Sequence, residues 1–248
     1  MKKIYLLLVT ICLIIVSCED GDQNDSNGSG TDGQGGSLAT FALKGDYLYV
    51  VDNTYLNVFN ISTPESPVQV NREYIGFEIE TLFGFKDYLY IGSRRGMFIY
   101  SLEKPEFPVE LSSVEHFTAC DPVVANDTHA YVTLHSVRDC TTGNLNVLEI
   151  YDIQNITEPV LISTRNLIQP KGLGLYGNYV IVCDDEIKIF DISDPKESKL
   201  VNTIDKEAFD VIIKDDMLIA IGRQGVYQYS LENKINGVQY SELSSIYF

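Results

Sequence analysis

Tryptophan is absent from this chain of 248 residues, histidine and methionine each occur three times, and positive charge is scarce. Eighteen lysines and arginines stand against 35 aspartates and glutamates, so the formal net charge at pH 7 is −17. Such a surface argues against binding to nucleic acid and against direct adhesion to anionic lipid. The lack of tryptophan also removes the strongest aromatic platform for stacking sugar rings.

The sequence also lacks the short motifs of familiar enzymes. No G-x-S-x-G, Walker, H-E-x-x-H or Rossmann pattern occurs. A nucleophilic serine or cysteine would need a histidine beside it, and His116, His129 and His135 all fall in one stretch of the chain. No D-x-D-x-D loop supports calcium binding. We therefore expect no metal and no organic cofactor.

The amino terminus resembles the signal of a bacterial lipoprotein. Lys2 and Lys3 precede an apolar run, residues 4–16, that is too short to span a bilayer comfortably. The run leads into IVSC (15–18), which resembles a lipobox. The resemblance implies that residues 1–17 are cleaved off and that Cys18 is acylated. Several acyl chains on one residue give the stable membrane anchoring that a single chain does not.

Residues 18–36 are interpreted as a flexible acidic tether. After Cys18 the stretch EDGDQNDSNGSGTDGQGG contains no hydrophobic residue, so it cannot contribute to a core. Its first acids resemble the export tract of surface-exposed Bacteroidetes lipoproteins: Glu19, Asp20 and Asp22. We therefore expect a lipid-anchored protein of the bacterial outer membrane, exposed at the cell surface if this tract acts in export. A plain soluble linker is the alternative.

Two short patterns recur along residues 37–248. The first is an apolar strand with a central aromatic residue and a polar stop, as in LNVFNIS (56–62) and IKIFDIS (187–193). The second precedes it and reads DYLYV (46–50) or NYVIV (178–182). The central aromatics are spaced by 41, 51, 39 and 39 residues: Phe59, Tyr100, Tyr151, Phe190 and Tyr229. A recurring spacing of this size indicates an array of similar supersecondary units.

Further apolar stretches complete four strands in each repeat, with turn signals between them and no helical period. The five units lie near residues 37–76, 77–117, 118–168, 169–206 and 207–248. Four-stranded units of about 40 residues predict a β-propeller, so we expect an all-β domain with five four-stranded blades. A β-helix or an open array is the alternative, although an open array leaves exposed edges that ring closure removes.

The repeats resemble a known family. GDYLYVVDN…LNVFNISTPESPV and GNYVIVCDDEIKIFDISDP are similar to the LVIVD repeat, whose consensus is G-D-Y-A-Y-V-A…G-L-x-I-x-D-I-S-x-P. The resemblance extends over residues 37–248 and is best in repeats one and four. The fifth repeat departs from it, with SLENKING where the others carry a turn with proline. The family implies a propeller-like bacterial surface or secreted protein and carries no established catalytic motif.

Repeat three contains an insertion and two cysteines. Its second and third strands are separated by HSVRDCTTGNLNV, which accounts for the spacing of 51 residues. In a propeller blade Cys120 and Cys140 would lie on the same face, and an exported protein permits a disulfide between them. A zinc site formed by the two cysteines with His116 or His135 is the alternative. Cys183 is expected to be a buried small hydrophobic residue.

Charged residues align at the start of the first strand, which lines the central channel of a propeller. They are expected to face a common space at one mouth: Glu80, Asp121, Lys171 and Asp210. Arginines from the loops between strands two and three lie on the same face: Arg94, Arg95, Arg138 and Arg223. Convergent charges in a cleft are candidate ligand-binding groups. Alternatively, these charges pair with one another or with the backbone of neighbouring blades.

Two functions remain open. The first is a membrane-anchored, non-enzymatic binding module for an unidentified protein, peptide or glycan, contacted through the face that carries the insertion. The second is a carbohydrate hydrolase or lyase that uses Glu80 and Asp121 as its carboxylate pair. The sequence favours the first, because no carboxylate has neighbours that suggest a raised pKa.

Overall fold

The repeated apolar patterns form strands, as their content of valine, isoleucine and tyrosine favours. The computed structural model describes residues 35–115, 122–136, 145–234 and 237–248, which contain twenty β-strands and one 3-10 turn, η1 (Pro195–Glu197). The side chain of Asp194 caps η1 by accepting a hydrogen bond from the Lys196 N–H. Within these residues no helix has the length and apolar character to cross a membrane.

The strands belong to five sheets of four. Blade 1 contains β1 (Phe41–Lys44), β2 (Tyr47–Val51), β3 (Tyr55–Asn60) and β4 (Val68–Tyr74); blade 2 contains β5 (Ile79–Phe85), β6 (Tyr88–Ser93), β7 (Gly96–Ser101) and β8 (Val109–Glu115). Blade 3 contains β9 (Val123–Ala125), β10 (His129–His135), β11 (Asn146–Asp152) and β12 (Val160–Asn166). Blade 4 contains β13 (Leu173–Tyr176), β14 (Tyr179–Cys183), β15 (Ile187–Asp191) and β16 (Lys199–Ile204). Blade 5 contains β17 (Asp210–Lys214), β18 (Met217–Gly222), β19 (Gly225–Lys234) and β20 (Gly237–Tyr247).

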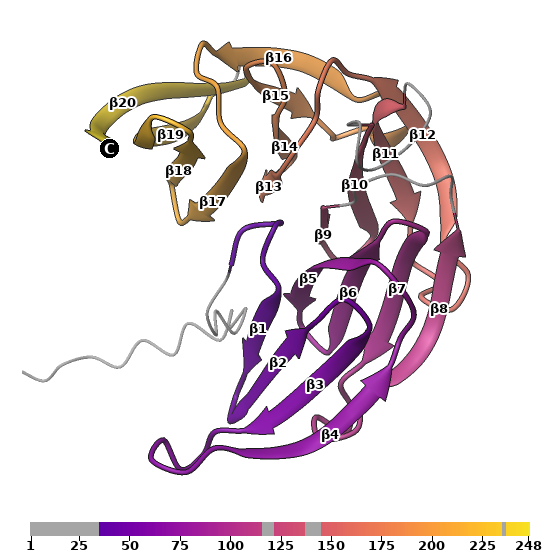
Figure 1. The fold of residues 1–248 in the computed structure, drawn as a ribbon. Coiled ribbons are helices and arrows are strands. Elements are labelled where there is room, and N and C mark those ends of the chain that lie inside the picture. The colour runs from indigo at the N-terminus through magenta and orange to yellow at the C-terminus, as the bar shows by residue number, and fades with distance from the viewer. Residues whose placement is uncertain (1–34, 116–121, 137–144, 235–236) are drawn as a thin grey trace, which may run out of the picture.

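Each sheet is an antiparallel meander in chain order, with its first strand nearest the axis and its fourth on the outside (Figure 1). The predicted all-β propeller of five four-stranded blades is confirmed. The connection between β10 and β11 covers residues 136–145, whereas β6 and β7 are joined by Arg94 and Arg95 alone. The longer spacing in repeat three therefore arises between its second and third strands, as predicted.

The central aromatic residues occupy equivalent positions in all five blades. Each lies opposite the second residue of strand two, which is apolar in every blade. Leu48 lies opposite Phe59 in blade 1, and Val180 lies opposite Phe190 in blade 4. In every blade the register between strands three and four shifts immediately before the aromatic residue. Such a bulge bends the strand and increases its twist, so the recurring aromatic marks the bend of each blade.

The polar stop of the sequence pattern has a structural role at the end of the third strand. The Asp191 side chain accepts a hydrogen bond of 2.8 Å from the Ser193 N–H. The side chains of Asn60 and Asp152 likewise accept a hydrogen bond from the backbone N–H two residues further along the chain. The next apolar residue, such as Ile192, donates its N–H to the carbonyl of Asn178 in the hairpin turn between strands one and two. The polar residue therefore ends the strand and initiates the turn.

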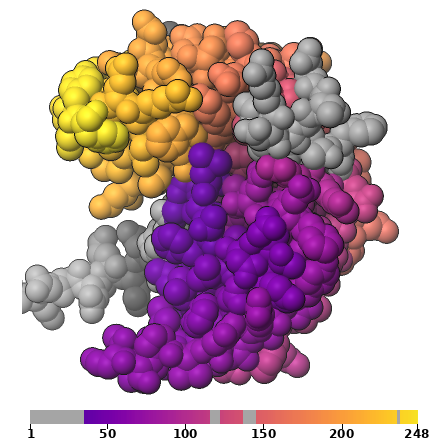
Figure 2. Space-filling model, in the orientation of Figure 1, coloured from indigo at the N-terminus to yellow at the C-terminus, as the bar shows by residue number. Residues whose placement is uncertain are grey.

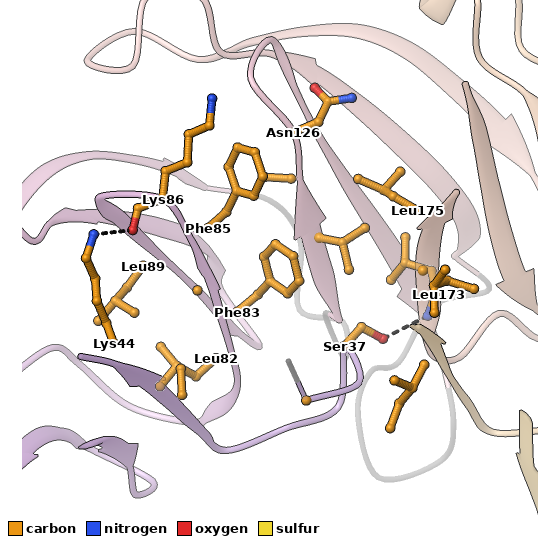
Figure 3. A pocket seen from close by; sticks show the side chains of 18 of the residues that line it. Ser37, Lys44, Leu82, Phe83, Phe85, Lys86, Leu89, Asn126, Leu173 and Leu175 are labelled. Carbon is orange, nitrogen blue, oxygen red and sulfur yellow. Dashed lines mark hydrogen bonds between the residues drawn. The ribbon is translucent and has the colours of Figure 1, made fainter. Parts of the chain in front are cut away.

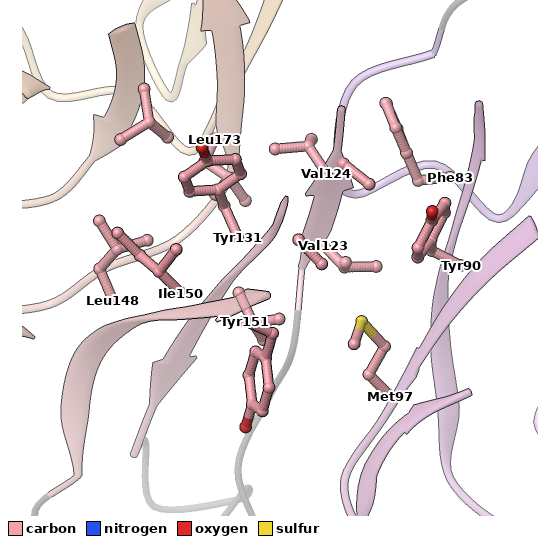
Figure 4. Close-up of a cluster of buried hydrophobic side chains, with 14 of the residues drawn as sticks. Phe83, Tyr90, Met97, Val123, Val124, Tyr131, Leu148, Ile150, Tyr151 and Leu173 are labelled. Carbon is pink, nitrogen blue, oxygen red and sulfur yellow. The ribbon is translucent and has the colours of Figure 1, made fainter. Parts of the chain in front are cut away.

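Three hydrophobic clusters fill the spaces between consecutive blades. One joins blades 1 and 2, a second joins blades 2, 3 and 4, and the third joins blades 4 and 5. Figure 4 shows part of the second, where Tyr90, Met97 and Val123 pack between blades 2 and 3. Buried hydroxyls tie blades together as well: Tyr49 of blade 1 donates a hydrogen bond of 2.9 Å to the Pro105 carbonyl of blade 2.

The seam between blades 5 and 1 is packed less tightly than the others. Phe41, on the face of blade 1 that points toward blade 5, is 52% exposed. Its counterparts in the other blades are at most 1% exposed: Leu82, Val123, Leu173 and Val211. No hydrophobic cluster in the described residues contains members of both blades 5 and 1, and Figure 2 shows the surface notched between them. The ring is therefore continuous through four seams and incomplete at the fifth.

Candidate functional site

A cavity of about 640 Å³ lies among the first strands of the blades. The side chains that line its middle are apolar, and Phe83, Leu173 and Val211 contribute from three blades. Figure 3 shows Phe83, Phe85, Leu173 and Leu175 directed toward this space. The cavity has the size of a small-molecule site, and most of the side chains that line it are apolar.

One end of the cavity has a polar rim built from the hairpin turns between strands one and two. Lys44 donates hydrogen bonds to the Lys86 carbonyl and to the Asp87 carboxylate, and Lys86 forms an ion pair with Asp127. Each of these ion pairs links one blade to the next, from blade 1 to 2 and from 2 to 3. Their carboxylates are exposed, so each pair contributes little to stability.

The same type of link recurs between blades 4 and 5 but not between blades 5 and 1. The Tyr176 hydroxyl donates a hydrogen bond of 2.7 Å to Asp216, at positions equivalent to Lys44 and Asp87. The corresponding residues at the fifth seam are Lys214 and Asp46, and no ion pair joins them in the described part of the chain. The rim is therefore interrupted at the fifth seam, and in the described residues also between blades 3 and 4, where the equivalent residues Asn126 and Asn178 are not joined.

The segment 35–38, which leads into blade 1, closes the other end of the cavity. The Ser37 hydroxyl donates to Asp210 Oδ1 at 3.1 Å and accepts a hydrogen bond of 2.8 Å from the Leu173 N–H. The Leu38 N–H donates to Asp210 Oδ2 at 3.3 Å. Ser37 is buried, and it connects the start of blade 1 to blades 4 and 5 across the channel (Figure 3).

Asp210 is the buried acid of this closure. Burial raises the pKa of its carboxyl to about 6, although hydrogen bonds from Val211, Ser37 and Leu38 counteract part of the rise. The carboxylate is packed against two glycines, because a Cβ at Gly36 or Gly172 would lie 2.1 or 2.2 Å from one of its oxygens. These positions require glycine for the close approach. Asp210 thus holds the segment that leads into blade 1.

Glu80 and Arg94, two other predicted ligand-binding residues, are bound to each other. Arg94 Nε donates to Glu80 Oε1 at 3.0 Å and Nη1 donates to Glu78 Oε1 at 3.3 Å. Glu80 is the extra residue of a bulge in β5, and Glu78 has a left-handed backbone with a φ of 60°. The hydrogen bond to Glu80 is the main cause that raises the pKa of the Arg94 guanidinium. The three side chains form a local charge cluster.

Lys171, the remaining described member of the predicted ring, pairs with the exposed Glu207 at 3.6 Å. Its carbonyl accepts a hydrogen bond of 2.5 Å from the buried Thr133 hydroxyl, which joins blades 3 and 4. The described members of the predicted ring, together with Arg94, therefore have partners within the protein, which is the alternative that the sequence leaves open; no ion pair in the described residues involves Arg95 or Arg223. Arg95 and Arg223 are exposed.

Several predicted residues lie outside the described residues: Cys18, Asp121, Arg138, and both Cys120 and Cys140 of the expected disulfide. His116, an expected ligand of the alternative zinc site, lies outside them too. Within the described part of the chain no group of three potential ligands is placed to hold a metal ion. Cys183 is a free thiol, fully buried as predicted, and burial raises its pKa well above the ordinary value.

Sequence reasoning missed two residues of this face. Ser37 was assigned only to the start of the first repeat, and a lone serine carries no signal for its contact with Asp210. Asp184 is buried in the loop between β14 and β15, where it accepts hydrogen bonds from the Ile168 N–H at 3.0 Å and from Lys188 Nζ at 2.7 Å. A run of acids, DDE (184–186), followed by a lysine was the available signal.

The comparisons with known proteins agree with this architecture. The model of the LVIVD repeat matches residues 35–72 and 171–205, which lie in the first and fourth repeats. No curated protein sequence matches the chain significantly.

Solved structures with a similar fold come from several bacteria. A functionally unknown protein from Desulfotomaculum acetoxidans has a TM-score of 0.68 at 12% identity, over 84% of this chain and 69% of the other. A protein from Lactobacillus plantarum gives 0.66 at 11% identity, over 81% and 67%. The periplasmic gluconolactonase PpgL of Pseudomonas aeruginosa gives 0.62 at 14% identity, over 82% and 68%. At identities this low, the comparisons show a shared fold only.

Proposed function

We propose that this protein is a membrane-anchored, non-enzymatic binding module, held by lipid on Cys18 at the bacterial outer membrane. The observation that carries the binding role is the cavity of about 640 Å³ on the axis of the blades. Most of the side chains along it are apolar, while at the predicted face Glu80 is bound to Arg94 and Asp210 to the closing segment. A site of this kind is suited to holding a ligand rather than to transferring protons.

The leader supports the anchoring. Two lysines, an apolar run of residues 4–16 and IVSC (15–18) occur together in the order that a lipoprotein signal requires. The tether after Cys18 has no hydrophobic residue and would separate the propeller from the bilayer surface.

The carbohydrate hydrolase or lyase is less well supported. Glu80 is bound to Arg94 at 3.0 Å, and its proposed carboxylate partner Asp121 lies outside the described residues. PpgL is a gluconolactonase on a similar fold, so lactone hydrolysis is an activity worth assaying, although fold alone does not transfer function.

Two experiments test this function. In the first, native cells expressing the full chain or Cys18→Ala are fractionated; we expect the variant to leave the membrane fraction and to lose its acyl mass. Wild-type protein without acyl mass would contradict the anchoring.

In the second, the mature chain with Cys18→Ser, expressed without residues 1–17, is screened by thermal shift against apolar molecules, peptides and glycans, and its hydrolysis of glycans and lactones is measured. We expect a ligand that stabilises the fold and no turnover. Hydrolysis by the wild-type chain that is lost in Glu80→Gln would contradict the proposal and support the hydrolase instead.

A further inference from the structure

Most of the side chains that line the cavity are apolar. Phe83 and Phe85 come from blade 2, Leu173 and Leu175 from blade 4, and Val211 from blade 5. A cavity with apolar walls tends to remain dry and to accept apolar guests, because water inside it lacks hydrogen-bond partners. These side chains therefore favour an apolar molecule.

Among the described residues, the polar groups at the closed end of the cavity already have hydrogen-bond partners. The Ser37 hydroxyl hydrogen is used by Asp210, and its oxygen already accepts from the Leu173 N–H. Asp210 itself is directed to Ser37 and Leu38. A ligand that reached this end would meet groups whose hydrogen bonds are already made, so its inner end should be apolar.

At the open end two of the three lysines are neutralised by neighbouring carboxylates. Lys44 is bound to Asp87 and Lys86 to Asp127. The Asn126 side-chain carbonyl accepts hydrogen bonds from the Thr128 and His129 N–H groups at 3.0 and 2.8 Å. These contacts pair Lys44 and Lys86, whereas Lys214 at the turn of blade 5 has no ion pair in the described residues.

The turns around the open end are acidic as a set. They carry five aspartates and three lysines: Asp46, Asp87, Asp127, Asp215 and Asp216, with Lys44, Lys86 and Lys214 at or beside the same turns. The whole chain carries a net charge of −17. An anionic group would therefore approach against the local and the overall field.

We propose that the channel binds one elongated apolar molecule, and that any polar end of this molecule is neutral or cationic and lies at the rim of Lys44 and Lys86. This inference rests on the proposed binding function, and it names the ligand class of the same site. The molecule would extend from the rim toward Ser37 between the first strands of the blades.

The test uses the mature chain with Cys18→Ser and the uncharged fluorophore N-phenyl-1-naphthylamine. We expect saturable binding of one fluorophore per chain and its displacement by decanol and decylamine. Decanoate should need a concentration roughly tenfold higher, because its carboxylate faces the acidic rim. Displacement by alcohols of increasing length should improve until the channel is filled and then stop improving.

Leu175→Asp, which places a charge in the channel wall, should abolish fluorophore binding, and the matched variant Leu175→Met should retain it. Far-UV circular dichroism verifies that both variants are folded. If Leu175→Asp does not fold, the proposal is judged from displacement by decanol, decylamine and decanoate and by alcohols of increasing length. Unchanged binding by a folded Leu175→Asp variant, or no dependence on chain length, would overturn the channel as the site. Stronger displacement by decanoate would overturn the ligand class alone. If the thermal-shift screen finds a ligand but the fluorophore does not bind, the proposed function stands and this inference fails.

Discussion

Ser37 and Asp210 are joined by a hydrogen bond of 3.1 Å across 173 residues of sequence. It is part of the polar contact that holds the start of blade 1 against blades 4 and 5, and it lies at the seam where the ring is otherwise incomplete. The same contact closes one end of the channel. Closure of the ring and closure of the channel therefore depend on one buried carboxyl group.

The first prediction concerns the pH dependence of stability. Burial raises the pKa of Asp210 from 3.8 to about 6, so between these values the folded chain binds a proton that the unfolded chain releases. The free energy of unfolding should therefore fall by up to about 3 kcal/mol as the pH rises from 4 to 6, and then level off. Urea unfolding of wild type and Asp210→Asn at intervals from pH 4 to 7 measures this, because the difference between them isolates Asp210.

Asp205→Asn, which removes an exposed carboxylate from the connection before β17, controls for the loss of one charge. If the stability difference between wild type and Asp210→Asn stays constant over this range, Asp210 does not titrate as described.

The second prediction concerns the incomplete seam. Amide hydrogens of β1 should exchange faster than those of the equivalent strand β13, because Phe41 is 52% exposed and its counterpart Leu173 is fully buried. Hydrogen exchange with fragment resolution compares the two strands in one sample. Equal protection of both strands would show that blades 5 and 1 pack as firmly as the others.

The third prediction concerns the hydroxyl that links blades 1 and 2. Tyr49→Phe leaves the Pro105 carbonyl without its donor at 2.9 Å and should lower the free energy of unfolding by about 1–2 kcal/mol. Tyr88→Phe is the matched control, since Tyr88 is partly buried and its hydroxyl makes no hydrogen bond in the described residues. Equal effects of the two substitutions, measured by urea unfolding, would remove the role assigned to the Tyr49 hydroxyl.

The fourth prediction concerns the hairpin turns. Gly177 has a φ of 53°, and a Cβ there would meet nothing within 4 Å, so only backbone strain opposes a side chain. Gly177→Ala should destabilise the fold by about 1 kcal/mol, and Gly177→Asn by less, because asparagine tolerates the left-handed region. Thermal unfolding of the two variants gives the ranking, and an alanine variant as stable as the asparagine variant would contradict it.

The repeat pattern was sufficient to predict the blades because it is local. The spacing of Phe59, Tyr100 and Phe190 reflects a bulge that each blade forms within its own four strands. The polar stop likewise acts on its own turn, as Asp191 does on Ser193. Such features depend on residues close in sequence, so they can be read from it.

The closure of the ring and the pairing of charges were not predictable in the same way. Whether Phe41 is covered depends on how blades 5 and 1 meet, which is decided by the sum of small rotations between all the blades. The contact of Ser37 with Asp210 has the same origin. Glu80 and Arg94 were placed on one face correctly, but alignment of repeats does not show that a bulge turns Glu80 toward Arg94.

The central proposal is that the channel binds apolar molecules, and crystals of the mature Cys18→Ser chain under xenon pressure test it. We predict xenon electron density in the channel between Phe83, Leu173 and Val211, because an apolar cavity accepts a polarizable apolar atom in place of water. A chain of ordered waters through the same space, with no xenon density, would contradict the proposal.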